Sequence, residues 1–277
     1  MKKIHLLFVT ALLLSVNAVA QGISFNDVVI DTITGKKQII NCSGQSYTIR
    51  PTIMAGGGSV AGYTVQSIPF APPFPIGPVP GYTTQLFTDA ADDTWSSIIP
   101  LPFGFCFFRN TYNQAVVGAN GILSFDVIHT PDNSCPWDLK SSPDIPSPNF
   151  IPEGLSVFNS IFGVYEDTYP VLSYLTPGVN GIYQGIFGVF PFRTLCVSFK
   201  DIPLFANQDQ RNSYQIVLYE GSNIIEVYVE HRELPASGWN NGIGIIGIIN
   251  NDGTDGIAAP GRNTTSSTWS VMNTGQQ

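Results

Sequence analysis

The chain contains the segment Gln215-Ile216-Val217-Leu218-Tyr219-Glu220-Gly221-Ser222-Asn223-Ile224-Ile225-Glu226-Val227-Tyr228. Two apolar arms flank a Gly-Ser-Asn turn, which is the pattern of a β-hairpin. In the second arm a period of two places Ile225, Val227 and Val229 on one face, and Glu226 and Tyr228 on the other. The segment predicts two antiparallel strands that turn one face to a core.

A second hairpin is predicted where Asn120-Gly121 separates the apolar runs 114–118 and 122–125, because Asn-Gly favours tight hairpin turns. Similar strand-like runs cover residues 23–30, 38–42, 46–53, 63–68, 98–108, 160–165, 181–189, 194–200 and 242–250. No convincing amphipathic helix follows residue 20. We therefore expect an all-β fold, an antiparallel β-sandwich with long Pro-rich loops.

Two Pro-rich segments interrupt the strands. Residues 69–80 hold six prolines, which cannot donate to a central strand, so an extended connector packed through Phe70, Phe74 and Ile76 is expected. A partner-binding motif is the alternative. Residues 131–152 also hold six prolines and are long for a loop of a compact domain. That loop is expected to be functional or to be fastened through Cys135.

The composition narrows the class of protein. Apolar residues make up 43% of the chain and charged residues only 12%, about half the usual share, with 27 Gly and 21 Pro. This suits an extracellular β domain and argues against disorder. The net charge is −8, and an acidic surface disfavours nucleic-acid binding.

The first twenty residues predict a secretory signal peptide. Lys2 and Lys3 precede an apolar run from Ile4 to Leu14, and Ala18-Val19-Ala20 is a small-x-small cleavage site. We expect residues 1–20 to be removed, with no transmembrane span left afterwards. Residues 21–80 then form N-terminal strands and the connector, in a domain of their own or in the same one, and residues 81–277 form the sandwich.

Export makes oxidised cysteines plausible. The four cysteines Cys42, Cys106, Cys135 and Cys196 suggest two disulfides with three possible connectivities. Cys106 and Cys196 lie in apolar runs, so they either pair across the core or stay buried as free thiols. Without a CxxC pair, and with few histidines, a zinc site is not expected.

Six motifs of the second half belong together: Asp92-Asp93-Thr94-Trp95-Ser96, Leu101-Pro102-Phe103-Gly104-Phe105-Cys106-Phe107, Val117-Gly118-Ala119-Asn120-Gly121-Ile122-Leu123-Ser124-Phe125, Phe162-Gly163-Val164-Tyr165-Glu166-Asp167, Gln215-Ile216-Val217-Leu218-Tyr219-Glu220 and Trp239-Asn240-Asn241-Gly242-Ile243-Gly244-Ile245. Over residues 85–270 they resemble the N-terminal domain of large surface proteins of gliding-type Bacteroidota, and they are similar to nidogen-like extracellular domains. The resemblance implies type IX secretion and a non-catalytic adhesive or scaffolding role. Such proteins usually continue into immunoglobulin-like repeats and a sorting domain.

Carboxylates near strand ends are candidate metal ligands. No cofactor is required by the sequence, but calcium prefers oxygen ligands that converge from several loops. The candidate set is Asp89, Asp92, Asp93, Glu166 and Asp167, with Asp201 a further acidic residue of the group. The spacing is not that of an EF-hand, so turn formation and solubility compete with calcium as explanations.

Nothing in the sequence selects a reaction. His129 and His231 are the only histidines after residue 20, there is no Gly-x-Ser-x-Gly, and nothing selects Glu166 and Glu226 as a glycosidase pair. We therefore expect no enzyme. Trp137, in the long loop beside Cys135, is the candidate ligand-binding aromatic residue.

The expected function is that of an exported surface module for adhesion or assembly, which binds a glycan or a protein partner. A secreted polysaccharide-acting enzyme, or its carbohydrate-binding module, is the alternative. The expected location is secreted or at the cell surface. The oligomeric state stays open.

Overall fold

The computed structural model describes residues 29–30, 37–38, 45–53, 60–82, 84–87, 92–129, 133–266 and 268–271. The predicted signal peptide, Asp89 and Cys42 lie outside these residues. The chain divides into two compact units, Met1–Ile40 and Asn41–Gln277. In the first unit, β1 (Val29–Ile30) pairs with β2 (Lys37–Gln38) in an antiparallel hairpin.

The second unit contains a seven-stranded antiparallel sheet in the order β4-β3-β13-β12-β11-β10-β5. Its strands are β3 (Gln45–Ile53), β4 (Val60–Ile68), β5 (Thr84–Gln85), β10 (Gly181–Phe187), β11 (Thr194–Pro203), β12 (Arg211–Tyr219) and β13 (Ile225–His231). Since β3 pairs with β13, residue 49 lies opposite residue 225, and residues 45–68 are part of this sheet.

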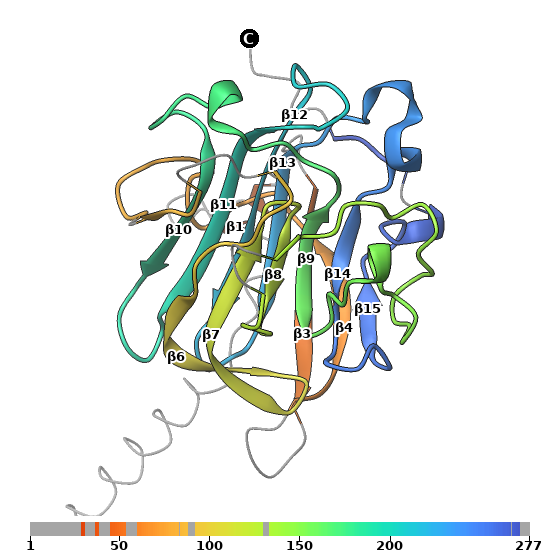
Figure 1. The fold of residues 1–277 in the computed structure, drawn as a ribbon. Helices are drawn as coiled ribbons and strands as arrows, with labels where there is room; N and C mark the ends of the chain where they lie inside the picture. The colour runs from red at the N-terminus through yellow and green to blue at the C-terminus, as the bar shows by residue number, and fades with distance from the viewer. Residues whose placement is uncertain are drawn as a thin grey trace, which may run out of the picture. The chain divides into compact units, whose positions relative to one another are not determined.

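A six-stranded sheet has the order β15-β14-β9-β8-β7-β6. Its strands are β6 (Ile99–Phe107), β7 (Asn110–Gly118), β8 (Ile122–Ser124), β9 (Ser160–Tyr165), β14 (Ile245–Ile249) and β15 (Gly256–Ala258). Figure 1 shows the two sheets as two layers, which confirms the predicted antiparallel β-sandwich.

The main core lies between the sheets, and both predicted hairpins form its walls. Ile225, Val227 and Val229 of β13 point into this core, while Tyr228 packs on the opposite face of the sheet, as the alternation predicted. In the Asn120-Gly121 turn Gly121 has a φ of 87°, whereas Asn120 keeps a negative φ. The Asn120 side chain instead bonds to neighbouring loops.

Long loops cover the outer face of each sheet. Phe70 and Phe74 of the Pro-rich connector pack over β11–β13, and the Phe74 ring stacks on Phe187 with 3.9 Å between centroids. Gly77 N donates to Ser198 Oγ over 2.9 Å. The connector is therefore packed, as expected. Leu139, Ile145 and Phe150 of the second Pro-rich loop cover the six-stranded sheet.

In the described part of the chain the helices are four short 3-10 turns: η1 (Pro152–Gly154), η2 (Leu172–Tyr174), η3 (Ala236–Gly242) and η4 (Thr264–Ser266). Among the described residues no helix has the length and apolar character that crossing a membrane requires.

Candidate functional site: an aromatic row above buried carboxylates

Five aromatic rings from separate loops form a continuous series, which we call the aromatic row. In spatial order it consists of Trp137, Trp239, Phe205, Tyr169 and Tyr174. Trp137 and Trp239 stack with centroids 5.6 Å apart and an interplanar angle of 18°. The remaining neighbours lie 5.5–5.6 Å apart at steeper angles. Phe205 is 38% and Tyr174 43% exposed, so this end of the row reaches solvent.

Backbone contacts fix the loops that carry the row. Tyr169 follows β9, and its N–H donates to Pro203 O at the end of β11 over 2.8 Å. Phe205 N in turn donates to Asp167 O over 3.3 Å. The segments that carry Tyr169 and Phe205 are therefore held against each other by a short backbone ladder, so that their rings need little ordering before a ligand binds.

Asn240 joins the two tryptophan loops. Its Nδ2 donates to Trp137 O over 2.5 Å, and its Oδ1 accepts from Leu139 N over 2.9 Å. Trp137 N also donates to Glu153 Oε2 over 2.7 Å. The amide of one buried Asn in η3 thus sets the position of the loop that carries Trp137 against Trp239.

Asp167 lies directly beneath the row. Trp239 Nε1 donates to its Oδ2 over 2.7 Å, and the side chain is only 5% exposed. Its Oδ1 is buried without a hydrogen-bond partner. Burial, followed by repulsion from Asp93, Asp92 and Glu166, raises the pKa of Asp167 to about 7, against the bond from Trp239. The carboxyl is thus poised to change charge near neutral pH.

Asp93 and Asp92 share this acidic environment. Burial raises the pKa of Asp93 to about 6, with added repulsion from Asp92 and Glu153, although Asn120 Nδ2 donates to Asp93 Oδ1 over 2.8 Å. Burial also raises the pKa of Asp92, whose Oδ1 is buried without a partner. Two of the predicted metal-ligand positions therefore do lie near Asp167.

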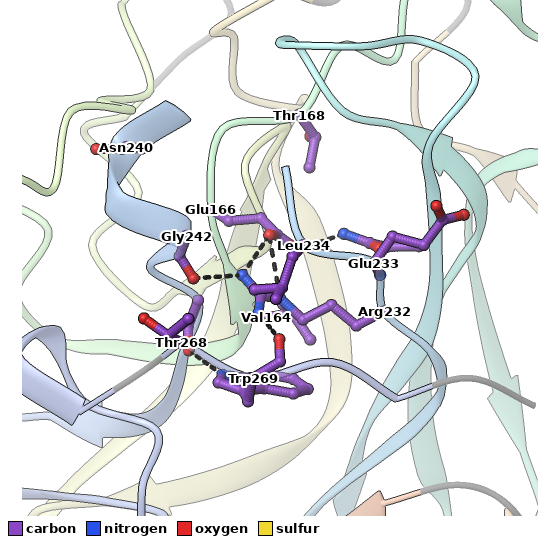
Figure 2. Close-up of polar contacts among 12 residues, drawn as sticks. Val164, Glu166, Thr168, Arg232, Glu233, Leu234, Asn240, Gly242, Thr268 and Trp269 are labelled. Carbon is purple, nitrogen blue, oxygen red and sulfur yellow. Dashed lines mark hydrogen bonds and ion pairs between the residues drawn. The ribbon is translucent and has the colours of Figure 1, made fainter. Parts of the chain in front are cut away.

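Glu166, another predicted ligand, is buried, and both of its carboxylate oxygens already accept hydrogen bonds from side chains of the domain. Figure 2 shows Arg232 contacting its carboxylate, with Arg232 Nη2 2.8 Å and Nε 3.1 Å from Glu166 Oε2. Asn212 donates to the other oxygen. Both members of the pair are fully or almost fully buried, so Glu166 serves to hold the fold together.

Arg232 extends this contact to the C-terminal part of the domain. It donates to Trp269 O and, over 3.1 Å, to Gly242 O at the end of η3 (Figure 2). Its guanidinium lies 4.4 Å from the centre of the Trp269 ring. The ion pair thereby fixes the end of η3, the element that carries Trp239.

The predicted calcium site is assembled only in part. Asp89 lies outside the described residues, Glu166 pairs with Arg232, and Asp201 accepts from Ser213 Oγ over 2.8 Å, on β11. Within the described residues no group of three or more His, Cys, Asp or Glu has an arrangement that could hold a metal ion. Calcium binding stays a prediction from the sequence.

The cysteines of the described segments, Cys106, Cys135 and Cys196, are buried free thiols. Cys196 faces the outer side of the seven-stranded sheet, where Tyr82 Oη lies 3.1 Å from its Sγ, and Cys135 lies in the cluster under the second Pro-rich loop. Cys106 and Cys196 therefore do not form the bridge across the core that was one of the two expectations. Cys42 lies outside the described residues.

The residues considered for catalysis are separated. His129 stacks on Trp95, with ring centroids 4.3 Å apart, and His231 Nε2 lies 3.0 Å from Glu233 Oε1. Glu226 accepts hydrogen bonds from the hydroxyls of Tyr219 and Tyr228 at 2.6 and 2.7 Å. Glu166 is instead bound by Arg232. The structure brings neither pair together into a recognisable acid–base arrangement.

In a comparison with known families, residues 77–277 match the family described as NIDO related. The chain belongs to the NIDO-related family. The nidogen-like part of the resemblance is thereby confirmed over the sandwich, and a NIDO-related domain suggests an extracellular module of the adhesion type. No curated protein and no solved structure matches the chain.

Proposed function

We propose that this NIDO-related domain is an exported, non-enzymatic adhesion module that binds a glycan along the aromatic row. The observation that carries the proposal is the row itself: five rings in series, held by braced loops, with Phe205 and Tyr174 open to solvent. Aromatic faces provide large, rigid contact areas at low entropic cost, and sugar rings offer matching C–H surfaces.

Charge narrows the class of glycan. Around the tryptophan end lie Glu153, Asp138 and the buried Asp167, while Lys140 Nζ, 5.8 Å from the Trp239 ring, carries positive charge and pairs with Asp138. Carboxylate oxygens accept hydrogen bonds from sugar hydroxyls but repel anionic sugars. A neutral or amino-substituted glycan therefore fits this surface better than an acidic one.

The test is binding of residues 21–277 to a panel of neutral, amino and acidic oligosaccharides. Phe205→Ala and Tyr174→Ala should each weaken binding about fivefold to tenfold, since one ring contact contributes about 1 kcal/mol. Phe192→Ala, which removes a still more exposed ring at another site, is the control and should leave glycan binding unchanged. Binding that is absent, or insensitive to both row variants, would reject the proposal in favour of a protein partner.

One observation favours the alternative, an enzyme that acts on a polysaccharide. Asp167 has a pKa raised to about 7 by burial and lies under an aromatic surface, which is the environment of many general acids. Turnover of a polysaccharide that Asp167→Asn abolishes while leaving binding intact would establish that alternative. We favour a binding role because five rings in series offer a contact surface, whereas nothing in the sequence selects a carboxylate pair for acid–base work.

Export and surface exposure complete the proposal. They are supported by the signal-peptide pattern of residues 1–20 and by the extracellular character of the NIDO-related family. Expression of the whole chain in a Bacteroidota host, followed by fractionation and N-terminal sequencing, should yield a surface-exposed protein that begins at Gln21. Dependence of that exposure on the type IX system tests the secretion route that the resemblance implies.

A further inference from the structure

The hairpin between β10 and β11 ends in an apolar tip, residues Gly188-Val189-Phe190-Pro191-Phe192. The two strands pair up to Phe187 and Thr194, and their connection loops beyond them (Figure 1). Val189 and Phe190 are each 75% exposed and Phe192 77%, the highest values among the large apolar residues of the described segments. Every side chain in the tip is apolar, so it meets water with no polar group of its own.

The tip is held in place. Phe192 N donates to Val189 O over 2.7 Å, closing the turn. At the base of the tip Arg193 binds Glu220. The guanidinium donates to the two carboxylate oxygens over 2.8 and 2.5 Å, and the backbone N–H of Arg193 donates to Glu220 Oε2 over 2.9 Å. The guanidinium also lies 5.6 Å from the Phe190 ring. The rings are therefore presented in a fixed position instead of collapsing onto the domain.

The size of the tip argues against a protein as its main occupant. Two phenyl rings and a valine at these exposures offer apolar surface on the order of 400 Å². A stable protein complex buries about 800 Å² on each partner, which is about twice this area. The charged residues at the base of the tip, Arg193 and Glu220, already pair with each other and so offer no charge to a protein partner. A lipid layer requires no matching surface, and burial of a small convex apolar tip is enough for peripheral binding.

Charge indicates the kind of lipid. Arg193, the cation that the described contacts place beside the tip, is neutralised by Glu220, and the chain as a whole carries −8. Such a protein gains nothing from a negatively charged leaflet. We propose that residues 188–192 insert into the apolar layer of a zwitterionic lipid surface and give the domain a peripheral membrane contact, separate from the aromatic row.

The experiment is flotation of residues 21–277 with phosphatidylcholine vesicles, which carry no glycan. The wild type should float with the vesicles, and the double variant Phe190→Ser/Phe192→Ser should lose at least tenfold in binding while keeping its melting temperature. Ile128→Ser, which removes a side chain that is 71% exposed outside the tip, and Phe205→Ala, in the aromatic row, should bind as the wild type does.

A direct reporter is Phe190→Trp, whose added emission should shift to the blue and be quenched by brominated lipid when vesicles are present. A wild type that does not float, a double-serine variant that floats equally well, or binding that strengthens when phosphatidylserine is added would each overturn the proposal. So would a wild-type dimer that the double variant converts to monomer without any vesicle binding, because the tip would then contact a second copy. Loss of glycan binding in Phe205→Ala leaves the vesicle result unaffected, so the two functions fail independently.

Discussion

Trp239 donates its indole N–H to one oxygen of Asp167 over 2.7 Å, while the other oxygen of that carboxylate is buried without a hydrogen-bond partner. This relationship joins the exposed aromatic row to the acidic interior below it. The indole N–H stabilises negative charge on Oδ2 of Asp167. Oδ1 has lost its water and gained no hydrogen bond, which makes ionisation of the carboxyl group unfavourable. The charge state of Asp167 and the position of Trp239 are therefore coupled.

The stability of the domain should fall as the pH rises towards neutral. Burial raises the pKa of Asp167 from 3.8 to about 7 and that of Asp93 from 3.8 to about 6. The folded chain thus holds these protons more tightly than the unfolded chain. The resulting stabilisation is complete below about pH 4 and is lost as the pH rises through about 7, amounting for Asp167 to at most about 4 kcal/mol.

Asp167→Asn should flatten this pH dependence and raise the melting temperature at about pH 8, since the amide oxygen can still accept from Trp239. Asp209→Asn, at an exposed position, is the control. Thermal unfolding across this pH range, in EDTA and again with millimolar calcium, measures both variants. A melting temperature that rises with pH would contradict the assignment, and a calcium-dependent rise that Asp167→Asn abolishes would support the calcium site predicted from the sequence.

Breaking the Glu166–Arg232 pair should lower the free energy of unfolding by about 3–5 kcal/mol, because replacing one of the two residues leaves the other as a buried charge without its partner. Arg232→Met is the direct variant, and urea unfolding measures the loss. Lys200→Met, which removes the partly exposed pairs with Glu230 and Asp201, should cost less, about 1 kcal/mol. Equal losses in the two variants would show that the buried pair does not hold the fold as described.

Gly121→Ala should be far more damaging than Gly178→Ala. Both glycines have positive φ, 87° and 74°, but an added Cβ would lie 2.1 Å from Val164 O at residue 121 and would meet nothing within 4 Å at residue 178. Gly178→Ala should therefore cost only the backbone strain, about 1 kcal/mol. Denaturant unfolding of the two variants measures the free energy of unfolding that each one loses. Similar losses would show that the added Cβ at residue 121 does not collide with Val164 O as described.

The thiols of Cys106, Cys135 and Cys196 should react only after unfolding. All three are buried, and burial raises the pKa of Cys196 to about 12 and that of Cys135 still further above its usual value. Iodoacetamide labelling followed by non-reducing mass spectrometry, with and without denaturant, measures their state. A bridge that includes any of the three would restore the disulfides predicted from the sequence.

The sequence was sufficient for the sandwich because its information is local. The alternation of Ile225, Val227 and Val229 around a short turn already determines a strand and its buried face, and the core contains all three. The Pro-rich connector was predictable for the same reason, since prolines exclude it from a sheet while Phe70 and Phe74 require burial.

The aromatic row could not be predicted in the same way. Trp137 was singled out, but Trp239, on which it stacks, and Phe205, the next ring, come from loops far along the chain, and no spacing relates them. Glu166 was chosen as a candidate metal ligand because its neighbour in sequence, Asp167, lies at the same strand end, and the sequence does not show that Glu166 pairs with Arg232. Just after the end of β9 the two side chains point to different partners, Glu166 to Arg232 and Asp167 to Trp239.

The pairing of β3 with β13 also bears on the order in which the domain folds. Strand β3 pairs locally with β4, but residue 49 finds its partner on β13 only at residue 225, so this hairpin joins the rest of the sheet only when nearly all of the chain is free to fold. Contacts this distant in sequence make folding slow, on the scale of milliseconds to seconds or longer. We therefore expect the β3–β4 hairpin and the hairpins of β10–β13 to form first and the seven-stranded sheet to be completed last, by the contact between residues 49 and 225.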